Sequence, residues 1–218
     1  MKIALVYEKP GMGIAKNFDS KEFDEEQTID QIERSLIELG HEVEKIVIDF
    51  DIIERLRSCK PDLVFNRSAG IFGESREAHV PAILEMLGIP YTGCGPLSCA
   101  ICLDKVKTKE ILAYHGIPTP KYQVFYSEKE KLKPSLIFPL IVKPAGEGSS
   151  IGISEKSVVF NEDMLNKQVI HILENHKQPA LVEEFIDGTE LTVSIVGNRY
   201  PKVLPVLQYI FLDSNTSN

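Results

Sequence analysis

The first third of the chain alternates apolar runs with segments of helical periodicity. Apolar, β-branched runs at residues 2–7, 42–49 and 62–66 predict three buried strands. Between the first two, residues 20–39 keep apolar side chains at helical spacing, and a shorter amphipathic piece precedes the third. Such alternation is typical of parallel strands joined by right-handed crossovers. The sequence therefore predicts an α/β protein that begins with a parallel sheet.

Two loops follow strands of this predicted sheet, at residues 8–20 and 66–77. Ligands of parallel sheets bind beyond the carboxyl ends of the strands, so both loops are candidates for a working edge. Gly11 and Gly13 in the first loop do not form a dinucleotide motif, because Lys16 occupies the third glycine position. The second loop is rich in charge, and it fits an exposed surface loop as well as a substrate loop.

A glycine-rich segment at residues 140–152 has the composition of an anion site. An apolar run ends at Lys143, and three glycines then bracket Ser149 and Ser150. Glycines let a backbone turn its N–H groups toward a ligand, while serine hydroxyls and a lysine add donors and charge. A polyphosphate is the expected ligand of this segment. Taken alone, the segment fits an ordinary glycine-rich hairpin as well.

The remaining patterns predict a second domain, with residues 116–120 as the break between domains at 1–116 and 117–218. Residues 180–186 and 190–196 are expected to pair as a hairpin around Asp187 and Gly188. The other expected elements are helices at 78–87, 97–115 and 161–176, and strands at 121–126, 137–144, 153–159 and 202–211, before a disordered tail at 213–218.

Charge and cysteine content narrow the classes of function. The net charge of −8 argues against nucleic acid or a membrane surface as the main partner. The apolar start is too short for a signal peptide or a membrane span, which predicts a cytoplasmic protein. The four cysteines lack the ligand spacing of a zinc site and the context of a redox pair, so buried thiols are the preferred interpretation. We assign no role to the histidines.

Five motifs occur in an order and spacing that resemble D-alanine–D-alanine ligases of the ATP-grasp superfamily. They are Ile-Pro-Tyr-Thr-Gly at 89–93, Asp104-Lys105 with Lys109, Gly-Ile-Pro-Thr-Pro at 116–120, Val-Lys-Pro at 142–144 with Gly-Ser-Ser-Ile-Gly at 148–152, and Val-Glu-Glu-Phe-Ile-Asp-Gly-Thr-Glu at 182–190. Together they spread over about half of the chain. The resemblance implies a Rossmann-like first domain, followed by the start of an α+β ATP-grasp domain.

The resemblance also implies site residues. Lys105 and Lys143 would meet ATP phosphates, and the loop at 146–152 would cover the triphosphate as a flexible lid. Within that loop, Ser149 and Ser150 are the expected catalytic hydroxyl donors. The remaining nucleotide contacts are Glu147, Gly148, Glu183 for the adenine amino group, the backbone of Glu184, Phe185 and Ile186 for the ring edge, and Glu190 for the ribose.

Each of these pieces has a plainer explanation when it is taken alone. Lys105 and Lys109 lie four residues apart, so they share a helix face that could simply be solvated. Glu183 and Glu190 could be solvent-facing positions on strands. The functional interpretation rests on all of the motifs together.

Two loops and the length of the chain depart from the ligase pattern. Residues 9–13 and 68–77 lack the family's acidic-and-serine motif and its His-Gly and Gly-Glu-Asp-Gly motifs, which lie where the amino acid substrate should bind. The metal-binding acids, a further lysine and an arginine of the family have no match before the sequence stops. We therefore expect a truncated chain with little ligase activity by itself, and we assign it no metal ligands.

The function expected is ATP-dependent joining of a carboxylate to an amine through an acyl phosphate, as in peptidoglycan precursor synthesis. ATP, Mg²⁺ and small amino acids are the expected cofactors and substrates, and a homodimer is kept open as the assembly. One alternative is an ATP-grasp ligase for another amino acid or peptide. A second is a non-catalytic remnant that binds nucleotide weakly or not at all.

Overall fold

The computed structural model describes residues 1–9 and 25–210. Contacts divide the chain into two compact units, Met1–Glu184 and Phe185–Asn218. The predicted domain break at 116–120 lies inside the first unit, and the division into 1–116 and 117–218 stays a prediction. The glycines at 11 and 13, Lys16, the start of the first helix and the tail at 213–218 lie outside the described residues.

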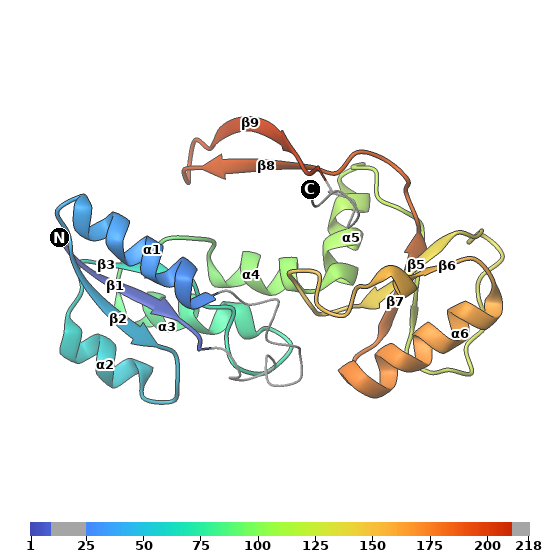
Figure 1. The fold of residues 1–218 in the computed structure, drawn as a ribbon, viewed down its shortest axis with the longest axis horizontal. Coiled ribbons are helices and arrows are strands. Elements are labelled where there is room, and N and C mark those ends of the chain that lie inside the picture. The colour runs from blue at the N-terminus through green and yellow to red at the C-terminus, as the bar shows by residue number, and fades with distance from the viewer. Residues whose placement is uncertain (10–24, 211–218) are drawn as a thin grey trace, which may run out of the picture. The chain divides into compact units, whose positions relative to one another are not determined.

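The first sheet of the larger unit has three parallel strands (Figure 1). They are β1 (Lys2–Tyr7), β2 (Glu42–Val47) and β3 (Leu63–Asn66), in the order β2-β1-β3. Ile3 pairs with Val43 on one side and with Leu63 on the other. Residues 3–6 of β1 are buried in succession, so both faces of this strand are covered, as is usual for parallel strands. The predicted parallel sheet is confirmed.

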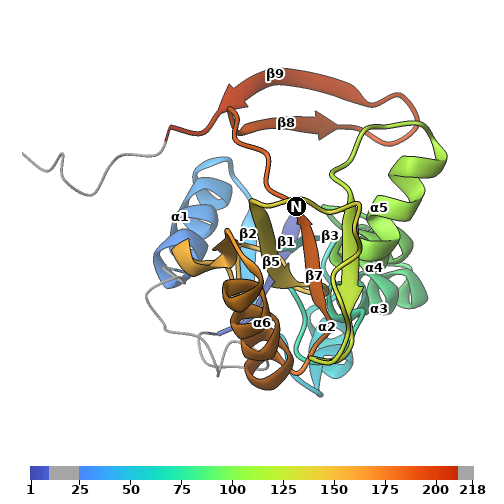
Figure 2. The same cartoon turned by 90° about the vertical axis from the view of Figure 1, so that its right-hand side faces the viewer.

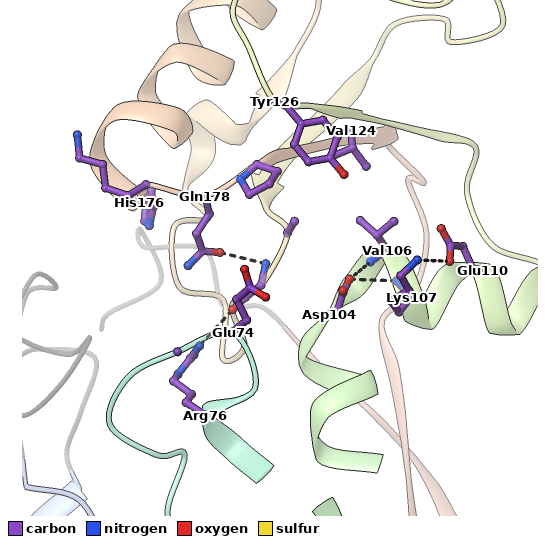
Figure 3. Close-up of a pocket in the computed structure, with 15 residues that line it drawn as sticks. Glu74, Arg76, Asp104, Val106, Lys107, Glu110, Val124, Tyr126, His176 and Gln178 are labelled. Atoms are coloured by element: carbon purple, nitrogen blue, oxygen red, sulfur yellow. Dashed lines mark hydrogen bonds and ion pairs between the residues drawn. The ribbon is translucent and has the colours of Figure 1, made fainter. Parts of the chain in front are cut away.

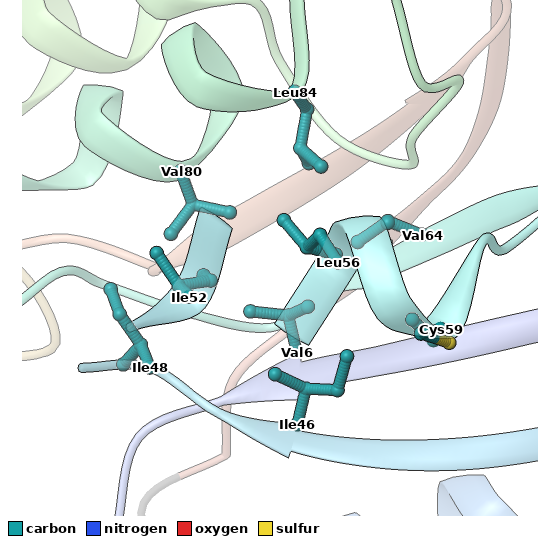
Figure 4. Packing of buried hydrophobic residues seen from close by; sticks show 10 residues of the cluster. Val6, Ile46, Ile48, Ile52, Leu56, Cys59, Val64, Val80 and Leu84 are labelled. Carbon is teal, nitrogen blue, oxygen red and sulfur yellow. The ribbon is translucent and has the colours of Figure 1, made fainter. Parts of the chain in front are cut away.

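Helices supply the rest of this core. They are α1 (Glu25–Glu38), α2 (Ile52–Cys59) and α3 (His79–Leu87), the last preceded by a 3₁₀ turn at Arg76–Ala78. Figure 4 shows side chains of α2 and α3 meeting those of the sheet: Val6, Ile46, Ile48, Ile52, Leu56, Cys59, Val64, Val80 and Leu84. Cys59 is buried as expected, but Cys94 and Cys102 are exposed. The expectation of buried thiols is therefore wrong for these two.

The helix predicted at 97–115 is two helices, α4 (Pro96–Leu103) and α5 (Lys105–Tyr114). Asp104 separates them with extended dihedral angles, φ −82° and ψ 98°. Its Oδ1 accepts the amides of Val106 at 2.9 Å and Lys107 at 3.0 Å. An aspartate that caps a new helix in this way ends the previous one, which the apolar periodicity did not reveal.

We expect Asp104→Ala to lower the free energy of unfolding by about 0.5–2 kcal/mol, the usual value of an N-cap carboxylate. The change leaves the amides of Val106 and Lys107 without this acceptor. Chemical denaturation of the variant measures the loss. Asp104→Asn keeps a capping oxygen and serves as the control, and an equal loss in both variants would contradict the capping role.

The second sheet is antiparallel, in the order β4-β7-β5-β6. Its strands are β4 (Tyr122–Phe125), β5 (Leu140–Pro144), β6 (Val158–Val159) and β7 (Ala180–Glu184). Helix α6 (Glu162–His171) continues through a π turn at Ile172–His176 and packs on one face of the sheet. Figure 2 shows α6 and α5 on different sides of these strands. Side chains alternate between the two faces, so neighbours in sequence have different surroundings.

Several predicted strand limits are wrong. Residues 155–157 form a 3₁₀ turn, so the strand expected at 153–159 is reduced to β6. The strand expected at 137–144 begins only at Leu140.

Among residues 1–9 and 25–210, no helix is both long enough and apolar enough to cross a bilayer.

The smaller unit contains β8 (Leu191–Val196) and β9 (Lys202–Gln208), an antiparallel pair in which Leu191 lies opposite Gln208. The predicted hairpin between 180–186 and 190–196 is therefore wrong. Strand β7 is already paired with β4 on one side and with β5 on the other. Because both of its edges are occupied, β8 has no place beside it and pairs with β9 instead.

Candidate functional site

A buried carboxylate with two lysine partners forms the centre of the candidate site. Glu183 on β7 forms an ion pair with Lys109, in which Oε2 lies 2.7 Å from the lysine Nζ. Its Oε1 forms a second ion pair with Lys143 on β5. Glu183 and Lys109 are each 6% exposed. The pairing of Ile141 with Glu183 puts Lys143 and Glu183 on the same face of the sheet. This group of three carries one net positive charge.

The Lys109 ammonium is held by neutral oxygens as well. It donates to Thr119 Oγ1 at 2.7 Å and to the carbonyl of Pro120 at 3.1 Å. The ammonium also lies 5.2 Å from the centre of the Tyr122 ring. With its three donors used in this way, Lys109 fixes the position of Glu183 and of α5.

Lys105 begins α5 and adds a second cation beside Lys143. Its backbone amide donates to the carbonyl of Ala145 at 3.0 Å, and its Nζ donates to the carbonyl of Glu147. Burial, followed by the nearby Lys143 ammonium, lowers the pKa of Lys105 to about 8. Desolvation and a like charge both disfavour the ammonium, and a bound anion would offset both effects. The surroundings of Lys105 therefore suit an anionic ligand.

The glycine loop that follows β5 has a backbone suited to that ligand. Ser149 and Ser150 adopt positive φ values of 48° and 59°. Their side chains are exposed, and within the described residues their amides and hydroxyls have no hydrogen-bond partner. Gly152, at φ 76°, cannot be replaced freely, because an added Cβ would lie 2.6 Å from Pro144 Cγ. A strained turn with free donors is a common form of anion site.

A second buried ion pair ties this loop to the loop after β3. Arg76 Nη2 lies 2.8 Å from Glu147 Oε2, and Nη1 donates to the carbonyl of Gly146 at 3.2 Å. Gln178 donates to Glu147 Oε1 and accepts the amide of Gly146 at 3.1 Å. Both oxygens of the Glu147 carboxylate are thereby engaged. The network holds the start of the glycine loop in place from two directions.

A pocket of about 530 Å³ adjoins this network (Figure 3). Its walls come from α5, the end of β4, and residues 73–76 and 176–179. In the figure Gln178 and Arg76 approach the backbone of the glycine loop. Val106, Lys107 and Glu110 of α5 line the pocket, whereas Lys105 and Lys109 do not. The pocket and the lysine cluster therefore use different faces of α5.

The structure brings together four of the residues expected from the sequence: Lys105, Lys143, Glu147 and Glu183. Gly148, Ser149 and Ser150 follow Glu147 in the same loop. Glu184 ends β7, where its carboxylate accepts the amide of Lys121 at 3.0 Å. Phe185, Ile186 and Glu190 belong to the smaller unit, so their proposed contacts with nucleotide stay predictions.

Sequence reasoning gave no role to three residues that build the site. Lys109 could have been found, because it lies one helical turn from Lys105 and the motif contains it. Arg76 lies in the loop after β3. The charge of this loop made the whole of it a candidate for the site, but did not single out Arg76. Gln178 carried no signal, since its position follows from the path of the chain into β7.

Comparison with known protein families matches residues 111–214 to the family described as "D-ala D-ala ligase C-terminus". A D-alanine–D-alanine ligase from Carboxydothermus hydrogenoformans is 38% identical over 84% of this chain and 60% of its own length. An uncharacterized protein from Sinorhizobium fredii is 34% identical over 96% of this chain and 65% of its own length. The chain thus spans about three fifths of the length of these relatives.

Solved structures that resemble this chain include D-alanine–D-alanine ligases as well. The crystal structure of a D-alanine–D-alanine ligase from Bacillus anthracis complexed with ATP superposes with a TM-score of 0.72. It is 27% identical in sequence, and the match covers 97% of this chain and 67% of that one. The predicted α/β architecture, a parallel sheet followed by part of an ATP-grasp domain, is confirmed by this match.

Proposed function

Because the chain belongs to the D-alanine–D-alanine ligase family of ATP-grasp proteins, we propose that it serves ATP-dependent joining of a carboxylate to an amine. In this reaction the carboxylate of one amino acid takes the γ-phosphoryl group of ATP, and the amine of a second displaces phosphate from the acyl phosphate. We also propose that the protein is cytoplasmic and acts in peptidoglycan precursor synthesis. We further propose that its two domains meet at residues 116–120.

The observation that carries the proposal is the pair of partly buried cations, Lys105 and Lys143, beside the glycine loop. Lys105 and Lys143 would contact the phosphates of ATP, whose negative charge would offset their mutual repulsion. Ser149 and Ser150 would donate hydroxyl and amide hydrogens to the same phosphates. The backbone of Glu147 and Gly148 would form the floor of the cradle.

The nucleoside would lie along β7 in this proposal. Glu183 would accept the adenine amino group, since an ionised carboxylate has lone pairs beyond those used by Lys109 and Lys143. The backbone from Glu184 through Ile186 would bind the ring edge, and Glu190 would bind the ribose hydroxyls. Each contact is testable by substitution or by nucleotide analogues that lack the group.

Mg²⁺ would accompany ATP by binding its phosphates, as in other nucleotide sites. The structure gathers no group of three His, Cys, Asp or Glu side chains for a metal within residues 1–9 and 25–210. We therefore propose the ion as part of the bound nucleotide and attribute no step to protein ligands of the metal.

Steady-state phosphate release tests the reaction class. We expect release from ATP to be slow in this chain, since the family's metal-binding acids have no match in its sequence, and to rise when D-alanine is added, because an amino acid carboxylate is the proposed phosphoryl acceptor. A panel of other small amino acids and dipeptides provides the comparison. If another amino acid stimulates release more than D-alanine does, the ligase uses a different substrate, which the altered loop at 68–77 favours. Nucleotide binding without release by any acceptor would indicate a non-catalytic member of the family.

ATP affinity should be highest below about pH 8 and should fall as the pH rises further. The free protein has Lys105 with a pKa of about 8, and bound phosphates favour the ammonium and raise that value. Binding must then take up a proton at a pH between the free and bound pKa values. Calorimetry at about pH 9, in buffers of different ionisation enthalpy, measures this uptake.

Lys105→Arg is the matched variant for this titration. Arginine stays protonated throughout the range, so the decline above about pH 8 should disappear. A wild-type affinity that stays constant from about pH 7 to about pH 10 would remove Lys105 from the phosphate contacts.

A further inference from the structure

Three of the four cysteines lie together around α4, and we call Cys94, Cys99 and Cys102 the thiol cluster. Cys94 precedes the helix, whereas the other two lie within it. The Cys99 thiol donates a hydrogen bond to the backbone carbonyl of Cys94, with 3.4 Å between Sγ and oxygen. Cys94 and Cys102 are exposed and Cys99 is half-buried, so small molecules in solution can reach the cluster. Cys59, by contrast, is buried in the core.

The helix start places Cys94 and Cys99 at two positions that commonly contact each other. Gly95 is the N-cap of α4, and Pro96 is its first residue. Cys94 is therefore the residue before the cap, and Cys99 is the fourth residue of the helix. Side chains at these two positions often pack together and fix the direction in which the chain enters a helix. The hydrogen bond from Cys99 shows that the two residues are in contact here.

We propose that Cys94 and Cys99 form a reversible disulfide, which makes the start of α4 a redox-sensitive site that reacts with small-molecule disulfides. The bond replaces a non-covalent contact between the same two residues with a covalent one. This site is separate from the proposed nucleotide site. It lies on a helix that contacts the turn Arg76–Ala78, whose arginine holds the glycine loop through Glu147.

Two thiol–disulfide exchanges complete the reaction. The Cys94 thiolate attacks one sulfur of the small disulfide, which forms a mixed disulfide and releases one small thiol. Cys99 then loses its proton, attacks the Cys94 sulfur and displaces the second small thiol. Two protein thiols are oxidised to one disulfide, and the small disulfide takes up their two electrons and two protons. Cys94 reacts first because it is exposed, whereas burial raises the pKa of Cys99.

Cys102 is a less suitable partner for Cys99. The two residues belong to one helix and lie three positions apart, where Cβ atoms are about 5–6 Å from each other. A disulfide needs about 3.5–4.5 Å between Cβ atoms, so a bond within the helix would distort it. Cys94 lies outside the helix between Gly93 and Gly95, and glycines on both sides let its backbone adjust.

Incubation of the full chain with millimolar oxidised glutathione tests the proposal. We expect an intramolecular disulfide within the thiol cluster, which dithiothreitol reduces again. Chymotrypsin locates the bond after the remaining thiols have been alkylated. Cleavage after Tyr91, Leu97 and Leu103 separates Cys94 from the other two cysteines of the cluster. We expect the disulfide to join peptide 92–97 to peptide 98–103 in the wild type.

Serine variants identify the two partners. Cys102→Ser leaves the proposed pair intact and is the matched control, so it should form the bond, with a loss of mass equal to two hydrogen atoms. Cys99→Ser should form no internal bond. It should instead keep one glutathione on Cys94, because the thiol that displaces it is missing. The wild-type peptide map needs no variant, and it decides the test if a serine variant fails to fold.

Four outcomes would overturn the proposal. The first is a wild type that forms no internal disulfide, and the second is a bond confined to peptide 98–103, which would pair Cys99 with Cys102. The third is an internal bond that persists in Cys99→Ser, which would pair Cys94 with Cys102. The fourth is a disulfide between two copies of the chain, which non-reducing electrophoresis would show as a dimer. ATP binding is not involved in any of these results, so the proposed function stands or falls separately.

Discussion

Replacement of Arg76 by methionine is expected to lower the free energy of unfolding by about 3–5 kcal/mol, the usual cost of breaking one side of a buried ion pair. Arg76 and Glu147 are 5% and 3% exposed, so Glu147 would keep a buried charge with Gln178 as its remaining side-chain partner. The carbonyl of Gly146 would also lose a donor. Denaturant unfolding measures the change directly.

The double variant Arg76→Met with Glu147→Gln separates the charge from the packing. Removal of both charges should restore most of the lost stability, because the main cost is an unpaired buried carboxylate. Arg57→Met, an exposed substitution on α2, is the control and should change stability by less than about 0.5 kcal/mol. A loss below about 1 kcal/mol for Arg76→Met would show that the pair is solvated.

Lys143→Ala should weaken ATP binding by about 1.5–3 kcal/mol, which corresponds to about 10- to 150-fold in the dissociation constant. The substitution removes a charge that the phosphates would contact. It also leaves Glu183 paired with Lys109 alone, so the carboxylate that would receive adenine becomes less well fixed. Both effects act in the same direction on nucleotide affinity.

Two further variants identify the cause of the Lys143→Ala loss. Lys131→Ala removes an exposed lysine that is not among the site residues, and should leave ATP affinity unchanged. Lys143→Arg keeps the positive charge, so it should retain part of the ATP affinity. The rest should be lost, because the guanidinium is larger than an ammonium group and presents its donors in a different geometry. If Lys143→Ala binds ATP as the wild type does, Lys143 makes no contact with the nucleotide.

The parallel sheet was predictable because each of its strands is a short apolar run with a helix beside it. Residues 2–7, 42–47 and 63–66 have this pattern, and local periodicity is enough to identify them. The pairing of later strands was not predictable in the same way. The turn at Asp187 and Gly188 suggested a hairpin, but β7 is central in its sheet and has both edges filled. Pairing depends on distant residues, which local sequence does not specify.

The break at Asp104 shows a similar limit. Apolar spacing is nearly continuous from α4 into α5, and a helix through both was the natural prediction. Asp104 caps α5, but an aspartate within an apolar helical pattern is equally consistent with a solvated residue on one continuous helix. Its consequence for the site is large, because the new helix start directs Lys105 and Lys109 toward Glu183 and the glycine loop.

For the site, motif order identified the lysines and the glycine loop, and tertiary structure supplied their partners. Lys105, Lys143 and Glu183 were predicted, and the structure brings them together in one unit. Arg76 reaches the loop across 71 positions of sequence to Glu147, so no spacing rule could pair them. Partners of that kind become visible only when the two loops meet.

The central claim is that the cations at 105 and 143 and the glycine loop bind ATP in one site. Isothermal titration of the wild type and of Lys143→Ala with a non-hydrolysable ATP analogue, in the presence of Mg²⁺ at about pH 7.5, tests it most directly. We predict saturable one-to-one binding by the wild type and a loss of about 10-fold or more in the variant. No saturable heat from the wild type up to millimolar nucleotide, or equal affinities for the two proteins, would contradict the claim.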